Sequence, residues 1–219
     1  PGCPAALLLT VLTAVTAAAL IVLARGRLRS FQGYDDAMLT HDPGMRALGN
    51  AAGFLVLLAS AWELQELVFT GWPAVSEAAE AARVAGQNAL PLMLSGLGLP
   101  LLSVAMGLLS ALSLLMLTRN NYWGERRGDR SAFLLLPAFG GCLWLVLTYR
   151  DMSSDPVVAG YACHLLALVA VTLALYYTVA LSFGKHPRPR AALYFSLLAV
   201  YLCLTALADG LELTQTLLL

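Results

Sequence analysis

Six runs of mainly apolar residues follow one another along the chain, and the charged residues gather between them. A membrane-spanning helix needs about 20 predominantly apolar residues. The pattern predicts spans at about 5–24, 47–69, 92–118, 131–149, 156–182 and 191–209. We therefore expect an all-α fold, a polytopic integral membrane bundle of six transmembrane helices, forming one domain over residues 1–219 with no soluble domain left over.

The composition favours the same class of protein. Hydrophobic residues make up 59% and charged residues 12% of the 219 residues, whereas an ordinary soluble domain has about 45–50% and about 25%. The formal net charge is zero, so no broadly basic surface exists for nucleic acid, and that class of partner is set aside. The expected partners are the lipid bilayer, a small solute or cation, and another membrane protein. No cofactor is expected.

The basic residues predict an orientation. Lys and Arg are retained on the cytoplasmic side of short loops, and eleven of the thirteen follow the first, third or fifth run. These eleven are Arg25, Arg27, Arg29, Arg46, Arg119, Arg126, Arg127, Arg130, Lys185, Arg188 and Arg190. We expect a multi-pass cell-membrane protein with these loops in the cytoplasm and both ends of the chain outside. Because positive charges follow the first run instead of preceding it, that run is expected to be a retained helix rather than a signal peptide.

Three stretches predict irregularities in the helices. The motifs "SGLGLP" (Ser95–Pro100) and "PAFGG" (Pro137–Gly141) lie inside the third and fourth runs, where kinks or local unwinding are expected. After the second run, "SEAAEAARVAGQN" begins with a capping serine, Ser76, and predicts a short helix lying on the outer membrane surface.

Two carboxylates at the end of the second run are the first candidates for a site. Glu63 and Glu66 are three residues apart in "ASAWELQELVFTGW", so they share one helical face. We expect them about 9 Å and about 5 Å below the outer end of the helix. One interpretation is that both reach the headgroups among neighbouring aromatic residues. The other is that Glu63 faces the bundle and binds a cation, a proton or the amine of a solute.

Other polar residues reach a similar depth. An outward-facing pocket between the second, fifth and sixth helices would combine Glu63 and Glu66 with His164, Arg150 and Asp209. The alternative for His164 is a neutral imidazole that is hydrogen-bonded to a neighbouring helix. For Arg150, the alternative is an interfacial anchor or an ion-pair partner of Asp209.

The cysteines suggest a second kind of site. Cys142, Cys163 and Cys203 fall on three helices, at a common depth of about 10 Å, and with His164 they would suit a soft metal or redox chemistry. Cysteine also packs well as a small apolar residue, and the sequence has no CxxC or paired Cys/His spacing. We therefore favour packing and expect no metal.

The sequence favours no enzyme class, because it has no HExxH, no GxSxG and no phosphate-binding glycine loop. The first hypothesis is a small-solute or ion transporter or transporter subunit, with Glu63 as the binding carboxylate. The alternative is a non-transporting accessory or sensory membrane subunit that docks a partner. A third hypothesis is a membrane enzyme whose chemistry is supplied by a segment outside this sequence.

Overall fold

The computed structural model describes residues 4–26, 34, 38–124, 130–152, 158–183 and 188–208. These ranges are almost entirely helical and contain no strand, which confirms the predicted all-α class. The elements are α1 (Pro4–Gly26), α3 (Pro43–Glu66), the π-helix η1 (Leu67–Gly71), α4 (Trp72–Val84), α5 (Leu90–Trp123), α6 (Arg130–Met152), α7 (Val158–Phe183) and α8 (Pro189–Ala208).

The helices have the length and composition of membrane spans. Five helical runs in the described residues are long and apolar enough to cross a bilayer, and α1 is apolar over Val11–Ala24. The chain is therefore a helical membrane bundle, as predicted. The spans expected from the sequence agree with the observed helices to within a few residues at most ends, except at the end of the second span.

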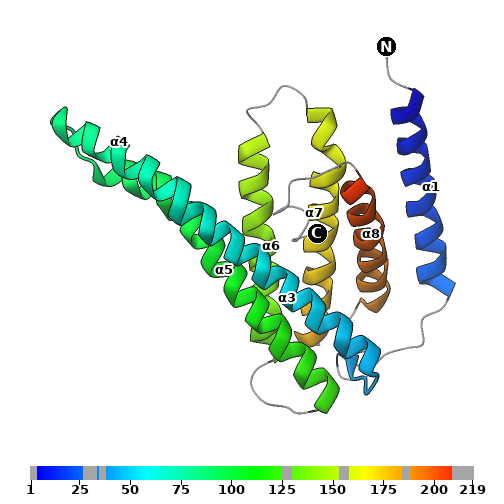
Figure 1. The fold of residues 1–219 in the computed structure, drawn as a ribbon. Helices are drawn as coiled ribbons and strands as arrows, with labels where there is room; N and C mark the ends of the chain where they lie inside the picture. The colour runs from blue at the N-terminus through cyan, green and yellow to red at the C-terminus, as the bar shows by residue number, and fades with distance from the viewer. Residues whose placement is uncertain are drawn as a thin grey trace.

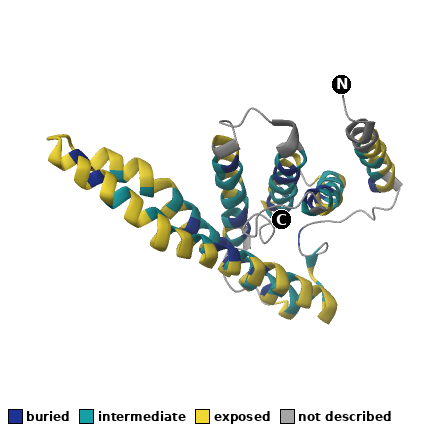
Figure 2. Ribbon diagram, turned by 45° about the horizontal axis from the view of Figure 1, so that its top comes forward, coloured by how far each residue is buried: buried dark blue, intermediate teal, exposed yellow. Residues whose placement is uncertain are grey.

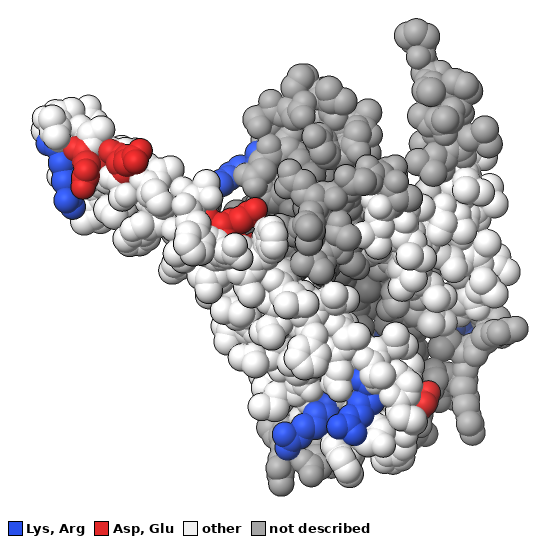
Figure 3. Space-filling model, viewed as in Figure 1, with Lys and Arg blue, Asp and Glu red and all other residues white. Residues whose placement is uncertain are grey.

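The helices pack in a row that does not follow their order in the sequence. α3 packs on α5, α5 on α6, α6 on α7, α7 on α8, and α8 on α1 (Figure 1). Neighbouring helices run in opposite directions, so the start of α3 and the end of α5 lie at the same end as the start of α8. We call this the basic end, because Arg46, Arg119, Arg188 and Arg190 lie there. Figure 3 shows basic side chains at the lower end of α3 and α5 with an acidic patch nearby, and side chains of both charges at the end that carries α4.

The second apolar run does not end where the sequence predicts. α3 continues through η1 into α4, giving one helical run from Pro43 to Val84 of 42 residues. The expected surface helix is thus a continuation of α3, and it packs against the first part of α5. Pro73 lacks an amide hydrogen and crowds the carbonyl four residues earlier. We attribute the π turn just before it to this crowding, since π turns absorb such local mismatches within a helix.

The prolines inside α5 and α6 do not unwind these helices. Pro100 lies within α5 and Pro137 within α6, and both helices are continuous across them. The local unwinding considered for "SGLGLP" and "PAFGG" therefore does not occur. Each proline leaves one carbonyl without its usual donor, but the rest of the helix keeps its ladder.

Small residues pack α7 against α8. A cluster of small residues joins them, including Ala167, Ala170, Ala199 and Ala206, and these short side chains allow close approach of the two backbones. Burial is concentrated in this part of the bundle, whereas most of α3, α4 and α5 is exposed (Figure 2). The α3–α5 hairpin, residues 43–123, extends well beyond the other helices at the end that carries α4 (Figure 1).

Candidate functional site

Glu63 lies on α3 and turns toward α5 rather than toward the membrane surface. Its Oε2 accepts a hydrogen bond from Ser103 Oγ at 3.3 Å, and the side chain is partly buried. Because α3 continues into α4, Glu63 lies in the middle of a 42-residue helical run, not two turns from its end. The expected depth below the end of the helix was therefore wrong, and the reason is the unbroken passage through η1.

The carboxylate lines a cavity of about 200 Å³ between α3, α5, α6 and α7. The lining is mostly apolar, with Glu63 and three serines as its main polar groups. The lining residues are Val56, Ser60, Glu63, Ser103, Gly107, Ser110, Leu114, Pro137, Gly140, Gly141, Leu143, Trp144, Val171 and Leu175. Most of these positions lie near the middle of α5, α6 and α7, so the cavity occupies the centre of the bundle.

Glycines on α5 and α6 allow the helices to meet around the cavity. A Cβ added at Gly107 would overlap the Ser60 hydroxyl, and one added at Gly140 would lie 2.7 Å from Ser110 Oγ. A side chain at position 107 or 140 would therefore collide with the serine that faces it. Small residues at helix interfaces are the usual means of close packing in membranes.

The serine hydroxyls of the cavity use their hydrogens within the protein. Ser60 Oγ donates to the Val56 carbonyl at 2.9 Å, and Ser110 Oγ donates to the Leu136 carbonyl at 3.2 Å. Ser103 donates to Glu63. The serine oxygens can therefore still accept hydrogen bonds from a ligand.

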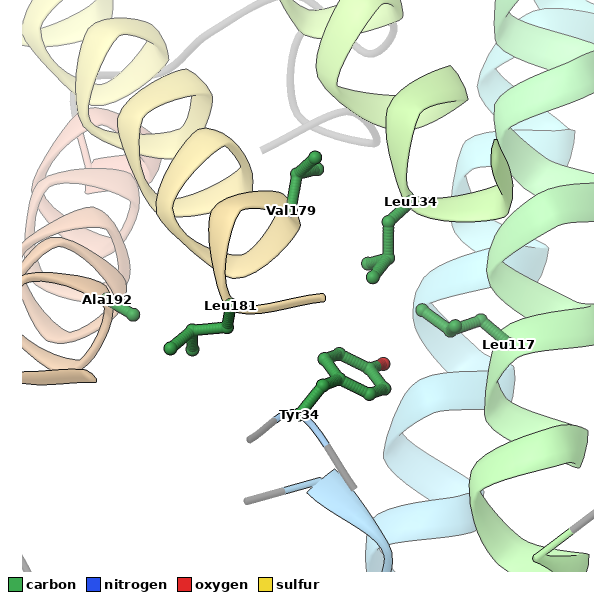
Figure 4. Packing of buried hydrophobic residues seen from close by; sticks show 6 residues of the cluster. All are labelled: Tyr34, Leu117, Leu134, Val179, Leu181 and Ala192. Carbon is green, nitrogen blue, oxygen red and sulfur yellow. The ribbon is translucent and has the colours of Figure 1, made fainter. Parts of the chain in front are cut away.

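An apolar layer lies next to the cavity on the side of the basic end. Leu117, Leu134 and Val179 are each buried, and each lies about one helical turn from a cavity residue on its own helix, toward the basic end. Tyr34 completes this layer from the segment that precedes α3, and its hydroxyl accepts a hydrogen bond from Asn121 Nδ2 at 3.2 Å. Figure 4 shows Leu117, Leu134 and Tyr34 pointing into the same space between the helices, with Val179 above them and Leu181 directed toward Ala192.

Glu66 does not share the site of Glu63. It is exposed, and its Oε1 accepts a hydrogen bond from Trp62 Nε1 at 3.2 Å. Residues three apart on a helix differ by about 60° around the axis at 3.6 residues per turn. That rotation is enough here to turn one carboxylate into the cavity and the other away from it.

His164 lies behind the cavity wall. Only 2% of its surface is exposed, and its ring meets Trp144 edge to face, with 6.1 Å between centroids. No described residue gives a hydrogen-bond partner to either ring nitrogen. His164 thus does not line the cavity, although Trp144 does, and the hydrogen bond to a neighbouring helix that the sequence suggested is not seen.

Of the remaining predicted pocket residues, the structure describes only Arg150, and it is not brought to Glu63. Arg150 is exposed in the last turn of α6 and does not line the cavity. Asp209 lies outside the described residues. The cavity also involves different helices from those expected: α8 contributes nothing to the lining, whereas α5 and α6 contribute much of it.

The cysteines do not gather with His164. Cys142 is exposed, Cys163 partly buried and Cys203 buried. Across the parts of the chain that the structure describes, no three His, Cys, Asp or Glu side chains come close enough to hold a metal ion. Packing remains the simpler interpretation of these residues.

Sequence reasoning missed Ser103, Gly107 and Trp144. A signal for the first two was present, because Ser103 and Gly107 have the spacing of four that brings small residues to one helix interface. Trp144 had no such signal, since a tryptophan inside a span reads as ordinary apolar surface.

Comparisons with known proteins found no match for this chain. No protein-family model matches the chain, and no curated protein or solved structure gives a match.

Proposed function

We propose that this membrane protein binds a small solute in the cavity lined by Glu63, and that it works as a transporter or transporter subunit. The observation that carries the proposal is the Glu63 carboxylate, which lines a mid-bundle cavity against Ser103. An ionisable group inside a membrane bundle is costly to keep, and such groups commonly mark ion or solute pathways. A purely structural role would be better served by an apolar residue there.

The position of the cavity supports a transport role over simple binding. Sites in transporters lie near the bilayer midplane, where access can alternate between the two sides. The Glu63 cavity lies near the middle of its helices, and an apolar layer lies between it and the basic end.

The protruding hairpin favours a second candidate, an accessory subunit that docks a membrane partner. The α3–α5 hairpin leaves the bundle and exposes large apolar side chains near its far end, including Val84, Leu90 and Leu94. Lipid would cover these residues in the first hypothesis, and a partner would cover them in the second. The second hypothesis does not require the cavity to bind anything.

A thermal unfolding screen separates the two candidates. The purified chain is melted in detergent against cations, amino acids, vitamins and neutral solutes, together with Glu63→Gln and Glu66→Gln. A ligand at 100 times its dissociation constant adds about 2.7 kcal/mol of stability. We expect a shift that disappears in Glu63→Gln and persists in Glu66→Gln, since only Glu63 lines the cavity.

The opposite result is equally clear. If no solute moves the transition, or if a shift survives Glu63→Gln, Glu63 does not form a binding site. The accessory role would then be the better explanation of the hairpin.

A further inference from the structure

We infer that the ligand of the Glu63 cavity is a small organic cation, an amine or quaternary ammonium with an apolar body. The inference rests on the proposed function, and it adds the chemical class of the solute. Four properties of the cavity support it: its charge, its hydrogen-bonding capacity, its apolar wall and its size.

The only charge that the described lining of the cavity can carry is negative. Glu63 is its only ionisable lining residue among those described, and no Lys, Arg or His shares the lining. A carboxylate in apolar surroundings is most strongly stabilised by a positive charge that is buried with it, because the interaction is less screened than in water. An anion would meet repulsion there without any compensating cation.

The hydrogen-bonding groups of the cavity are mainly acceptors. The hydroxyl hydrogens of Ser60, Ser103 and Ser110 are directed to Val56, Glu63 and Leu136. Apart from the indole N–H of Trp144, the lining side chains thus offer oxygen lone pairs. Such a site suits a ligand that donates hydrogen bonds or needs none, which describes protonated amines and quaternary ammonium groups.

The wall of the cavity suits the rest of such a ligand. Leucine, valine and proline side chains make up much of the lining, and Trp144 adds an aromatic ring. Tryptophan provides the most favourable aromatic face for a cation. His164 packs edge to face on Trp144 and thereby restrains the ring from behind.

The size of the cavity limits the ligand. A cavity of about 150 Å³ accommodates benzene, so the 200 Å³ found here accommodates a molecule slightly larger than benzene. A dehydrated inorganic ion fits less well. Ca²⁺ takes about six to eight oxygen ligands at short distance, whereas one carboxylate and three hydroxyls line this cavity.

Matched pairs of ligands test the class directly. The probes are choline and benzylammonium, each beside a neutral molecule of the same shape: the carbon analogue of choline, and benzyl alcohol. Binding to the intact purified chain is measured by titration calorimetry. Because a hydrogen bond or contact to a charged group is worth more than a neutral one, we expect at least one cation to bind about 10- to 100-fold tighter than its neutral partner.

Substitutions of cavity residues test which side chains cause the preference for a cation over its neutral analogue. Glu63→Gln should abolish the preference for the cation, and Glu66→Gln should leave it unchanged. Trp144→Leu should weaken cation binding by about 2- to 30-fold, with Trp72→Leu, on exposed surface, as its control. Trp144→Phe keeps an aromatic ring and should retain more of the affinity than Trp144→Leu. The unfolding temperature without ligand identifies any variant that fails to fold.

The outcomes distinguish the two levels of the proposal. If a neutral molecule binds as tightly as its cation, or if Na⁺ or Ca²⁺ binds at Glu63 and neither organic cation competes, the inferred class is wrong while a binding site remains. If none of the probes and none of the solutes in the unfolding screen binds, both the class and the proposed function are wrong.

Discussion

The contact between Ser60 and Gly107 is the point where α3 and α5 come closest around the cavity, and it can be tested by adding one methyl group. In Gly107→Ala, the new Cβ would overlap the Ser60 hydroxyl and lie 3.2 Å from Ser60 Cβ. The Ser60 hydroxyl is held by a hydrogen bond to the Val56 carbonyl, so turning it aside would break that bond. The helices must therefore separate, or Ser60 must change rotamer and lose its hydrogen bond.

The expected magnitude follows from two opposing effects. Overpacking of a close contact costs about 1–3 kcal/mol, whereas replacing a helical glycine by alanine stabilises a helix by up to about 1 kcal/mol. Gly98→Ala provides a matched control on the same helix, since a Cβ there meets nothing within 4 Å. The difference in unfolding free energy between Gly107→Ala and Gly98→Ala isolates the overpacking, and we expect Gly107→Ala to be less stable by about 1–3 kcal/mol.

Thermal unfolding in detergent measures this difference. For a chain of about this length, 1 kcal/mol corresponds to about 2–4 °C. The double variant Ser60→Gly with Gly107→Ala removes the overlapping hydroxyl and should recover most of the loss, giving a favourable coupling energy in a double-mutant cycle. Equal unfolding temperatures for Gly107→Ala and Gly98→Ala would refute the reasoning, because the two helices would then not meet at Ser60 and Gly107.

Three further predictions follow from other residues. His164→Leu should leave the unfolding temperature unchanged or raise it, because it removes two buried nitrogens without partners; a clear drop would mean that the imidazole has a partner in the native membrane protein. Ser103→Ala should weaken binding of a cationic probe at Glu63 by up to about tenfold, since the carboxylate loses the hydrogen bond from Ser103, and calorimetry showing no change would argue against this hydrogen bond. In intact cells, Arg83→Cys should react with a membrane-impermeant maleimide and Arg119→Cys should not; the reverse labelling would invert the predicted orientation.

Much of the fold could be predicted from the sequence, because membrane spans are long and their apolar character does not depend on their neighbours. The spans near α6, α7 and α8 were predicted closely. Glu63 was also chosen as a candidate from the sequence, because a carboxylate beside a long apolar run differs clearly from its neighbours along the chain. These features depend on composition along the chain and not on how helices meet.

The site itself depended on what one sequence does not reveal. The rotation of α3 decides that Glu63 turns inward and Glu66 outward, and hydropathy alone does not report that rotation. The lateral order of the helices decides that α5 and α6 line the cavity instead of α8. The aromatic residues near Trp72 also suggested a membrane interface, where the chain in fact continues as a helix through η1.

The unbroken helical run from Pro43 to Val84 is much longer than the hydrocarbon core of a bilayer is thick. At 1.5 Å per residue, its 42 residues extend about 63 Å, about twice the 30 Å thickness of a bilayer's hydrocarbon core. Fitting the whole run inside that core would require a tilt of about 60°, beyond the range of about 0–40° found for membrane helices. The tip with Glu77, Glu80 and Arg83 therefore reaches into the headgroups or the water beyond, and only part of the run lies in the hydrocarbon core.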